Sequence, residues 1–298
     1  MISVIIPTYG HPQFLKAAIE SVLSQTFKDW ELIIVDDNNP DTESRKATEI
    51  IVSDFIAKGY NIQYIRHDKN KNGAVARNTG FAIAKGEYIA LLDSDDEYMP
   101  DRLQKCYDAM RNAPQNVAGV YTGCEFRRSG KTYNRYTGVK DGNFLVETLA
   151  CRFKFCTGSN IFVRKSVIDE LDGFDESFLR HQDYEFLVRL FEKYSLIAIP
   201  EILVIKNNEN FNLPDIDKQM AIKKQYLDKF HYIIEQLPED DVNYIMHSNF
   251  IGIAESAMAQ KCYKTAHEYY KKAAEFGDLT GRERFRRIIY PIYTLISR

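Results

Sequence analysis

Aspartate residues cluster at one point of the chain, directly after a short segment of strand length. Residues 88–92 are apolar or aromatic, and Asp93, Asp95 and Asp96 follow within four positions. Like charges this close repel each other, so we expect either a cation that neutralises them or a solvated turn. Hard divalent cations such as Mg²⁺ and Mn²⁺ prefer carboxylate oxygens and share them with substrate phosphates. The segment therefore has two interpretations. It is either a metal site for a phosphate-bearing ligand or a hydrated turn before the next helix.

A second acidic strand end precedes this cluster in the chain. Residues 31–35 are mostly apolar and are followed by Asp36 and Asp37. In open α/β sheets, ligands bind outside the carboxyl ends of the strands, so this end and the Asp95 end can face one crevice. The carboxylate of Asp37 can accept a hydrogen bond from a nucleobase or a ribose. The alternative is an Asx-type turn with the residues that follow.

Other polar side chains are placed to join the same crevice. Pro7, Thr8 and Tyr9 end the first apolar segment and can offer backbone groups and a ring to a base. Arg77 has a planar guanidinium that suits a phosphate or a base, although a solvated helix face would explain it equally well. Asp183 begins an amphipathic helix, where the helix dipole favours an acid. It is also a candidate general base, if a sugar hydroxyl comes within hydrogen-bond reach.

The elements that would position these residues alternate along the chain. Apolar periodicity predicts strands at 2–6, 31–35, 61–66, 88–92, 117–126 and 158–163, and helices at 14–25, 42–58, 74–84, 100–112, 144–151, 166–171 and 182–194. Residues 132–142 are expected to be irregular, and 196–205 form a broken apolar segment. Strands and helices that alternate with short connections indicate an α/β fold with a Rossmann-like, mostly parallel central sheet flanked by helices.

The composition changes sharply at residues 207–214, which are rich in Asn. Beyond this segment the periodicity predicts only helices, at 217–237, 240–261, 263–276 and 281–297. We therefore expect two domains, which are an α/β domain at 1–212 and an all-helical C-terminal region at 213–298.

Composition limits the class of protein. The 298 residues carry a formal net charge of −3, so the chain as a whole has no electrostatic case for nucleic-acid binding. Its five cysteines have no CxxC spacing, which argues against a disulfide framework or a zinc site and fits a reducing cytoplasm. No apolar segment is long enough to cross a bilayer, and the first residues lack a signal-peptide pattern. We therefore expect a cytoplasmic protein.

Taken together, these segments resemble glycosyltransferase family 2, which has the GT-A fold. The matching segments are residues 4–9, 21–27, 31–37, 76–80 and 86–96, followed by 173–176 and 182–185. The resemblance covers roughly residues 1–205, and its ordered motifs are far more specific together than any one alone. It implies an inverting enzyme that moves a sugar from a nucleotide donor, expected to be UDP-linked, to a hydroxyl of a saccharide or lipid-linked acceptor. Bacterial surface polysaccharide assembly is the setting that the resemblance suggests.

The resemblance also implies a role for each candidate residue. Donor-binding residues would be Pro7, Thr8, Tyr9, Asp37, Arg77, Asp93, Ser94 and Asp95. Within this set Thr8 and Asp37 would contact the nucleoside, with Asp37 at the uracil ring, and Arg77 would lie near the base or the diphosphate. Asp95, with Asp93, would hold Mn²⁺ or Mg²⁺ at the diphosphate, and Asp93 would alternatively touch the ribose. Asp183 would deprotonate the acceptor hydroxyl, and a bound metal would stabilise the departing diphosphate.

Two positions depart from the family pattern. Gln182 stands where many relatives have an acidic residue, which changes the charge beside Asp183. Lys206 and Asn207 stand where relatives often have a histidine, so metal binding would depend on Asp95, the diphosphate and water.

The C-terminal region lies outside the resemblance. Arg282, Arg284, Arg286 and Arg287 precede an apolar and aromatic segment at 288–296. Such a segment can contact the anionic inner face of the plasma membrane, or it can pack on its own domain or on a second subunit.

Two other functions of the protein remain open. It could be a catalytically degenerate transferase domain that acts as a scaffold through its helical tail, or it could be a sugar nucleotidyltransferase. The latter would need a Gly-rich basic phosphate loop after the first strand, and residues 8–12 lack one.

Overall fold

The computed structural model describes residues 1–207 and 214–286, and the chain divides into two compact units. The first unit contains Met1–Asn143 and Lys154–Phe211, and the second contains Phe144–Phe153 and Asn212–Arg298. The boundary expected between 212 and 213 falls outside the described residues. Residues 144–153 were expected in the first domain, whereas the structure groups this segment with the C-terminal helices.

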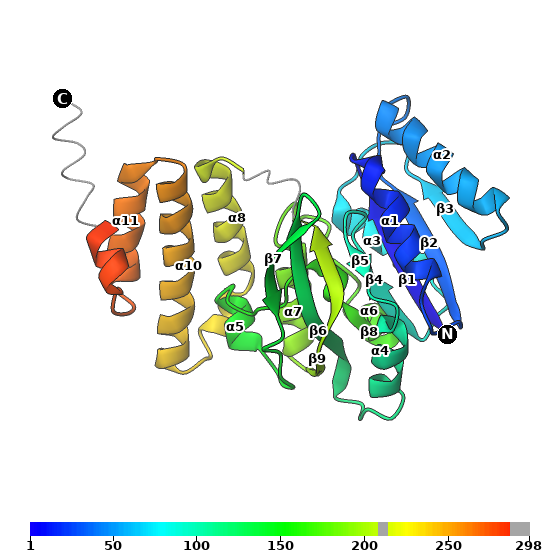
Figure 1. Cartoon of the computed structure of the whole chain (residues 1–298). Coiled ribbons are helices and arrows are strands. Elements are labelled where there is room, and N and C mark those ends of the chain that lie inside the picture. The colour runs from blue at the N-terminus through cyan, green and yellow to red at the C-terminus, as the bar shows by residue number, and fades with distance from the viewer. Residues whose placement is uncertain (208–213, 287–298) are drawn as a thin grey trace. The chain divides into compact units, whose positions relative to one another are not determined.

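The N-terminal half of the first unit is a parallel sheet with helical connections (Figure 1). Its strands are β1 (Ile2–Thr8), β2 (Trp30–Asp36), β3 (Ile62–Arg66) and β4 (Tyr88–Leu91), in the spatial order β3-β2-β1-β4. The connecting helices are α1 (Pro12–Leu23), α2 (Glu43–Ala57) and α3 (Gly73–Ile83). All three neighbouring strand pairs are parallel. The α/β fold and the mostly parallel sheet expected for this region are therefore confirmed.

The same sheet continues beyond β4 with strands of mixed direction. It runs β4-β8-β6-β9-β5, with β5 (Glu97–Tyr98), β6 (Val117–Arg128), β8 (Phe162–Arg164) and β9 (Ser195–Asn207), and β7 (Lys131–Tyr136) pairs with β6. The other elements are α4 (Arg102–Met110), the 3₁₀ turn η1 (Gly158–Asn160), α6 (Lys165–Glu170) and α7 (Gln182–Phe191). The β6–β9 pair is parallel, whereas β8 and β5 pair antiparallel with their neighbours.

Three segments differ from their sequence-based predictions. Residues 131–136 form a strand instead of irregular structure, because Ser129 and Gly130 both adopt positive φ and close a two-residue hairpin turn. Residues 195–207 form one continuous strand, and the register shifts opposite Thr122 and Gly123 account for its broken apolar pattern. Residues 158–160 form a 3₁₀ turn, and the expected strand begins only at Phe162.

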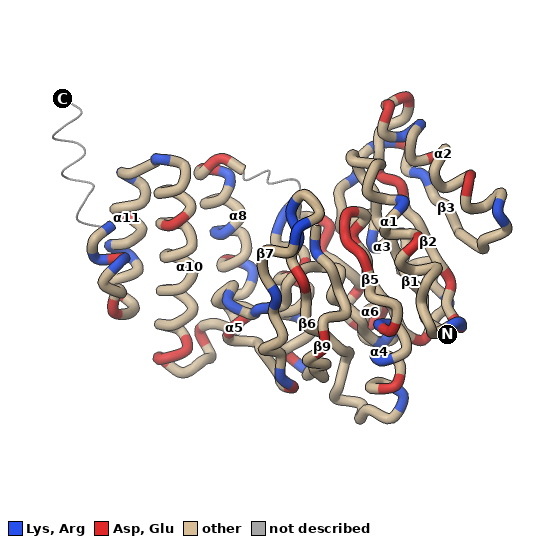
Figure 2. The backbone as a smooth tube through the Cα atoms, viewed as in Figure 1, with Lys and Arg blue, Asp and Glu red and all other residues tan. Residues whose placement is uncertain are grey.

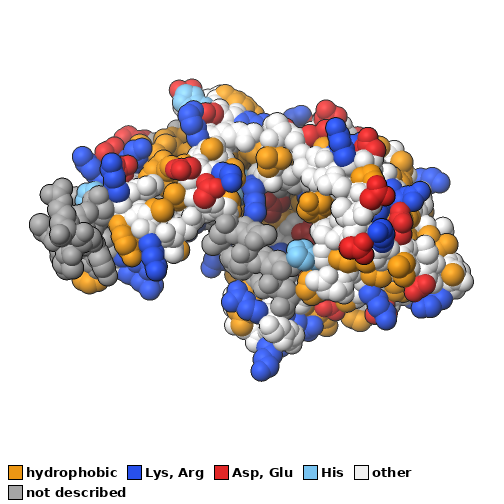
Figure 3. Space-filling model, turned by 90° about the horizontal axis from the view of Figure 1, so that it is seen from above, with side chains coloured by type: hydrophobic (Ala, Val, Ile, Leu, Met, Phe, Trp, Pro, Cys, Tyr) orange, Lys and Arg blue, Asp and Glu red, His pale blue; other side chains and the backbone are white. Residues whose placement is uncertain are grey.

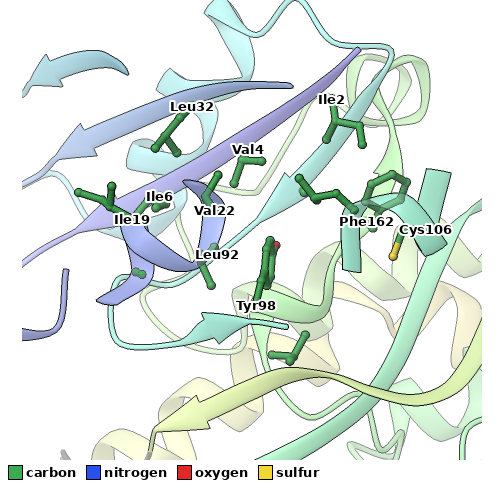
Figure 4. Close-up of a cluster of buried hydrophobic side chains, with 14 of the residues drawn as sticks. Ile2, Val4, Ile6, Ile19, Val22, Leu32, Leu92, Tyr98, Cys106 and Phe162 are labelled. Carbon is green, nitrogen blue, oxygen red and sulfur yellow. The ribbon is translucent and has the colours of Figure 1, made fainter. Parts of the chain in front are cut away.

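One face of the sheet carries the main hydrophobic core. Alternate residues of β1, namely Ile2, Val4 and Ile6, are fully buried and belong to the same cluster as Ile19 and Val22 of α1. Figure 4 shows this cluster together with Leu32, Leu92, Tyr98, Cys106 and Phe162. The core fixes β1, β2 and β4 side by side, and it therefore aligns their carboxyl ends.

The opposite face of β1 and β2 packs against α3, and α7 joins α3 through Phe174. Gly80 of α3 lies so close to β1 that a Cβ atom built there would be 2.5 Å from Ile5 Cγ2. Phe174 stacks between Phe81 of α3 and Phe186 of α7. These contacts bring the first turns of α3 and α7 to the same edge of the sheet.

The second unit is helical. It contains α5 (Leu145–Leu149), α8 (Ile216–Lys229), α9 (His231–Ile234), α10 (Glu239–Ala259) and α11 (Tyr263–Ala273). Ala266, Tyr270 and Ala273 of α11 are buried in its core, and Asn249 Nδ2 donates a hydrogen bond to Leu149 O. Residues 281–286 are helical, whereas Arg287 and the apolar segment 288–296 lie outside the described residues. Within the described ranges, no helix is both long enough and apolar enough to span a membrane.

Candidate active site

A cavity of about 590 Å³ lies at the carboxyl ends of β1, β2 and β4. All nine candidate residues line it, namely Pro7, Thr8, Tyr9, Asp37, Arg77, Asp93, Ser94, Asp95 and Asp183. The tube view shows the acidic segment beside β5, and the space-filling view shows acidic side chains inside a hollow of the surface (Figures 2 and 3). The structure thus brings together residues that are as much as 176 positions apart in the chain (183 − 7 = 176).

The Asp37 carboxylate is surrounded by donors from the segment that follows β3. Its Oδ1 accepts hydrogen bonds from His67 Nδ1 at 2.7 Å and from the backbone N–H of Lys71 at 2.8 Å. Its Oδ2 accepts from Asn70 Nδ2 at 2.7 Å and from the backbone N–H of Asn72 at 3.0 Å. A carboxylate has about four lone-pair positions, so all of them are used within the protein. Asp37 therefore fixes the loop that lines the cavity.

Arg77 connects the two acidic parts of the cavity wall. Its Nη2 donates to Asp93 Oδ1 at 2.7 Å, and its Nη1 donates to Gln182 Oε1 at 2.9 Å. The guanidinium also lies over the Phe174 ring, 5.5 Å from its centroid. A Cβ atom on Gly73 would meet Arg77 Nη1 at 3.0 Å, so the glycine leaves room for this arrangement. The side chain of Arg77 is held in one orientation at the cavity by an acid, an amide and an aromatic face.

The Asp93–Asp96 loop is fixed by η1. Ser159 Oγ accepts a hydrogen bond from the backbone N–H of Asp93 and donates one to Asp96 Oδ2. Asp96 is fully buried and also accepts a hydrogen bond from Thr157 Oγ1 at 2.9 Å. Asp93 and Asp95 remain partly exposed. The loop therefore presents two carboxylates to the cavity and buries the third as an anchor.

The three carboxyl groups of this loop differ in acidity. Burial raises the pKa of Asp96 to about 7, with further contributions from Asp95 and Asp93. Burial and the Asp93 charge also raise the pKa of Asp95. For Asp93 burial acts in the same direction, but the charges of Arg77 and Lys206 outweigh it and lower its pKa. The most acidic of the three is thus the one that pairs with Arg77.

Asp183 occupies the first turn of α7 and lines the cavity. Its Oδ1 accepts a hydrogen bond from the backbone N–H of Tyr184 at 3.0 Å. Burial raises its pKa, and the charge of Arg77 partly opposes this rise. A partly exposed carboxylate with a raised pKa is suited to accept a proton from a ligand hydroxyl.

The carboxylates of the cavity can hold a divalent cation only together with other ligands. In the part of the chain that the structure describes, no three His, Cys, Asp or Glu side chains are placed to hold a metal ion by themselves. Mg²⁺ is commonly bound by one or two carboxylates, substrate phosphates and water. Asp95 and Asp93 fit that arrangement, because both line the cavity and the ion pair of Asp93 with Arg77 uses its Oδ1 atom.

The cavity also contains residues that the sequence did not single out. Asn70, Asn72 and Gly73 line it from the loop before α3, and Leu179 and Arg180 line it from the loop before α7. The turn composition of 70–73 was the available signal for the first group. His67 has no such signal, because its role depends on the pairing of β3 with β2, which the chain order alone does not reveal.

The family comparison agrees with this geometry. The model of "Glycosyl transferase family 2" matches residues 3–172, more than half of the chain. An uncharacterized glycosyltransferase of Methanocaldococcus jannaschii is 29% identical over 246 residues, which are 78% of this chain and 77% of that protein. The amylovoran biosynthesis glycosyltransferase AmsB of Erwinia amylovora is 29% identical over 215 residues, which are 66% of this chain and 67% of that protein.

Solved structures show the same fold. S. aureus TarS 1-349, solved in complex with UDP, matches with a TM-score of 0.55 and 13% identity over 97% of this chain and 91% of that chain. The mannosyltransferase PcManGT of Pyrobaculum calidifontis, solved with GDP-Man and Mn²⁺, matches with a TM-score of 0.58 and 14% identity over 97% of this chain and 84% of that chain. Both likenesses concern the fold, which is the GT-A glycosyltransferase fold. The match to the family model decides membership, and this chain belongs to glycosyl transferase family 2.

Proposed function

We propose that the protein transfers a sugar from a UDP-linked donor to a hydroxyl of a saccharide or lipid-linked saccharide, with inversion at the anomeric carbon. The observation that carries this proposal is the single cavity that contains Asp37, Arg77, Asp95 and Asp183. Acceptors of hydrogen bonds, a fixed guanidinium and a candidate base are what binding a nucleotide sugar and activating a hydroxyl require.

The donor nucleoside would occupy the β1 and β2 side of the cavity. Thr8 Oγ1 is buried and has no hydrogen-bond partner among the described residues, so a base or ribose would satisfy it. Tyr9 is 58% exposed and offers its ring to the same ligand. Asp37 contributes by fixing the loop at 70–72, whose groups line the cavity.

The diphosphate would lie toward Arg77 and the Asp93–Asp96 loop. A guanidinium binds phosphate oxygens through its planar donors. Asp95, with Asp93, would hold Mn²⁺ or Mg²⁺ at this position. A bound cation would supply charge neutralisation for the leaving diphosphate.

The chemical step needs one proton acceptor and one bond exchange. Asp183 takes the proton of the acceptor hydroxyl, and that oxygen forms a bond to the anomeric carbon. The bond from this carbon to the diphosphate oxygen breaks at the same time, and its electron pair leaves with the nucleoside diphosphate. Attack from the face opposite the leaving group inverts the configuration.

Surface polysaccharide assembly on the inner face of the plasma membrane is the setting we propose. The likeness to a protein of amylovoran biosynthesis supports it. A peripheral membrane contact or a subunit contact would involve residues 282–298, most of which lie outside the described residues.

Asp183→Asn tests the mechanism. We expect the amide to abolish transfer, because it cannot take the proton, while the affinity for UDP measured by calorimetry changes less than about threefold. Asp169→Asn, which removes a surface partner of Lys165, is the matched control and should keep full activity. Turnover of the Asp183→Asn variant at the wild-type rate would show that Asp183 is not the general base.

The substrates and the alternatives can be examined with the wild-type protein. A thermal-shift screen of nucleotide sugars with Mn²⁺ identifies the donor, because a ligand that binds only the folded state raises Tm. Hydrolysis of the selected sugar nucleotide without an acceptor supports an enzyme. Binding of a donor without hydrolysis or transfer to any acceptor would favour a degenerate scaffold, and formation of a sugar nucleotide from a nucleoside triphosphate would favour a nucleotidyltransferase.

A further inference from the structure

Lys206 lies at the end of β9, directly beside the acidic loop of the cavity. The antiparallel pairing of β5 with β9 places Glu97 opposite Ile205. Asn207, the residue after Lys206, donates from its backbone N–H to Asp96 Oδ1 at 3.1 Å and from its side-chain Nδ2 to Asp95 O at 2.9 Å. These contacts of its chain neighbour hold Lys206 next to the loop.

The ammonium group of Lys206 is close to the buried anchor of that loop. Its Nζ donates a hydrogen bond to Thr157 Oγ1 at 3.2 Å and lies 3.7 Å from Asp96 Oδ2. Asp96 already accepts hydrogen bonds from Thr157, Ser159 and Asn207. Lys206 therefore has only a loose ion pair, and its side chain remains 25% exposed.

The charges of the cavity carboxylates act on this ammonium. Burial alone would lower the pKa of Lys206, but the charges of Asp96, Asp93, Asp95 and Asp183 raise it above its ordinary value. Three of these four residues line the cavity. Lys206 is not itself among the residues that line the cavity, but its positive charge lies beside the loop that presents Asp93 and Asp95 to it.

We propose that the Lys206 ammonium is a built-in cation of the diphosphate subsite, which contacts the diphosphate of the bound nucleotide and allows binding without a divalent metal. This inference rests on the proposed function. Asp93, Asp95 and Asp183 would repel a nucleoside diphosphate, and Arg77 is already partly neutralised by Asp93. Lys206 supplies the second positive charge that offsets this repulsion, and the loose pairing leaves its ammonium donors able to turn toward phosphate oxygens.

Lys206→Met removes the charge and keeps the length of the side chain. We expect this change to weaken the binding of UDP in EDTA by about tenfold or more, as calorimetry would measure it, because a charge-assisted contact is lost. The affinity for uridine, which has no phosphate, should change by less than about twofold. Mn²⁺ should restore part of the lost UDP affinity, since it supplies positive charge to the same phosphates.

Two further variants separate charge from structure. Lys206→Arg should keep UDP binding in EDTA within a few-fold of the wild type. Lys105→Met, which removes a surface lysine that pairs with Glu201, should leave both ligands unaffected. An equal loss of UDP and uridine binding in Lys206→Met would show a structural role and overturn the proposal.

Other outcomes would also overturn it. Unchanged UDP affinity in Lys206→Met, or wild-type UDP binding that disappears completely in EDTA, contradicts a metal-free contact by this lysine. If the wild-type protein binds neither UDP nor GDP with or without Mn²⁺, the proposed function itself fails. That result is distinguishable from a protein that binds UDP equally well without Lys206.

Discussion

The imidazole Nδ1 of His67 lies 2.7 Å from Oδ1 of Asp37, and both side chains are almost fully buried. The opposite ring nitrogen, Nε2, lies 3.0 Å from Thr79 Oγ1 of α3. A carboxylate can only accept, so Nδ1 carries a proton and donates it to Asp37, while Nε2 shares a hydrogen bond with the threonine hydroxyl. His67 therefore links β3, the Asp37 strand end and α3, and it positions the loop that lines the cavity.

His67→Ala should weaken nucleotide binding indirectly, through the loop that His67 positions. The change leaves Asp37 Oδ1 with one donor fewer and frees the loop at 70–72. We expect a loss of UDP affinity of about tenfold and of roughly 1–3 kcal/mol in the free energy of unfolding.

The conservative variant separates the hydrogen bond from the packing. His67→Asn can keep a donor near the Nδ1 position, so it should recover most of the UDP affinity. His231→Ala, at an exposed histidine that pairs with Glu235, is the control and should change neither quantity. Full UDP affinity in His67→Ala, measured by calorimetry, would contradict the positioning role.

The raised pKa of Asp183 predicts the acidic limb of the pH–rate profile. A general base acts only when it is deprotonated, so the rate falls as the pH drops through its pKa. Because burial raises that pKa, the fall should occur above the ordinary aspartate value of 3.8. The measurement is kcat/KM from pH 4 to 8 in the wild-type protein, and a rate that stays level down to pH 4 would argue against Asp183 as the base.

Gln182→Glu should move this limb to higher pH. Gln182 Oε1 accepts a hydrogen bond from Arg77, and the Arg77 charge lowers the pKa of Asp183. A carboxylate at 182 would neutralise Arg77 and add a negative charge next to Asp183. We expect a shift of roughly one pH unit, which corresponds to about 1.4 kcal/mol. An unchanged profile would show that residue 182 does not influence the acidity of its neighbour.

Much of this site could be predicted from the chain because its residues stand at strand ends. Apolar segments that stop at Asp37 and Asp93 indicate parallel strands, and parallel strands place their ends at one edge. Periodicity placed Asp183 in the first turn of a helix but could not place it at the cavity, because this helix follows an irregular loop and no strand end. The motif resemblance was needed to connect it with the cavity.

The supporting residues could not be predicted, because they act across the sheet. The contact of His67 with Asp37 requires the β2–β3 pairing, and the contact of Lys206 with Asp96 requires the β5–β9 pairing. From the sequence, Lys206 is notable only because it stands where relatives often have a histidine. Long-range pairings of this kind depend on register, which a single sequence without aligned relatives specifies poorly.

Gly80→Ala should destabilise the protein although alanine is the better helix former. A Cβ atom at Gly80 would meet Ile5 Cγ2 at 2.5 Å, so α3 would have to move away from β1. Overpacking of this kind costs about 1–3 kcal/mol. In contrast, Gly252 of α10 has no atom within 4 Å of its Cβ position, so Gly252→Ala should stabilise by about 0.5–1 kcal/mol. Urea unfolding of both variants measures the difference, and equal signs would contradict the close approach of α3.

Asp95 and Asp93 line the same cavity, but their contacts predict different effects of substitution on the affinity for UDP. Asp93 is paired with Arg77, whereas Asp95 lines the cavity and has a raised pKa. Asp95→Asn should remove the gain in UDP affinity that Mn²⁺ provides, because the cation loses a carboxylate ligand. Asp93→Asn should instead release Arg77 and weaken UDP binding in EDTA as well as in Mn²⁺. Calorimetric titrations of UDP in both buffers separate the two effects. If Mn²⁺ still raises the UDP affinity of the Asp95→Asn variant, the metal ligand must be another residue.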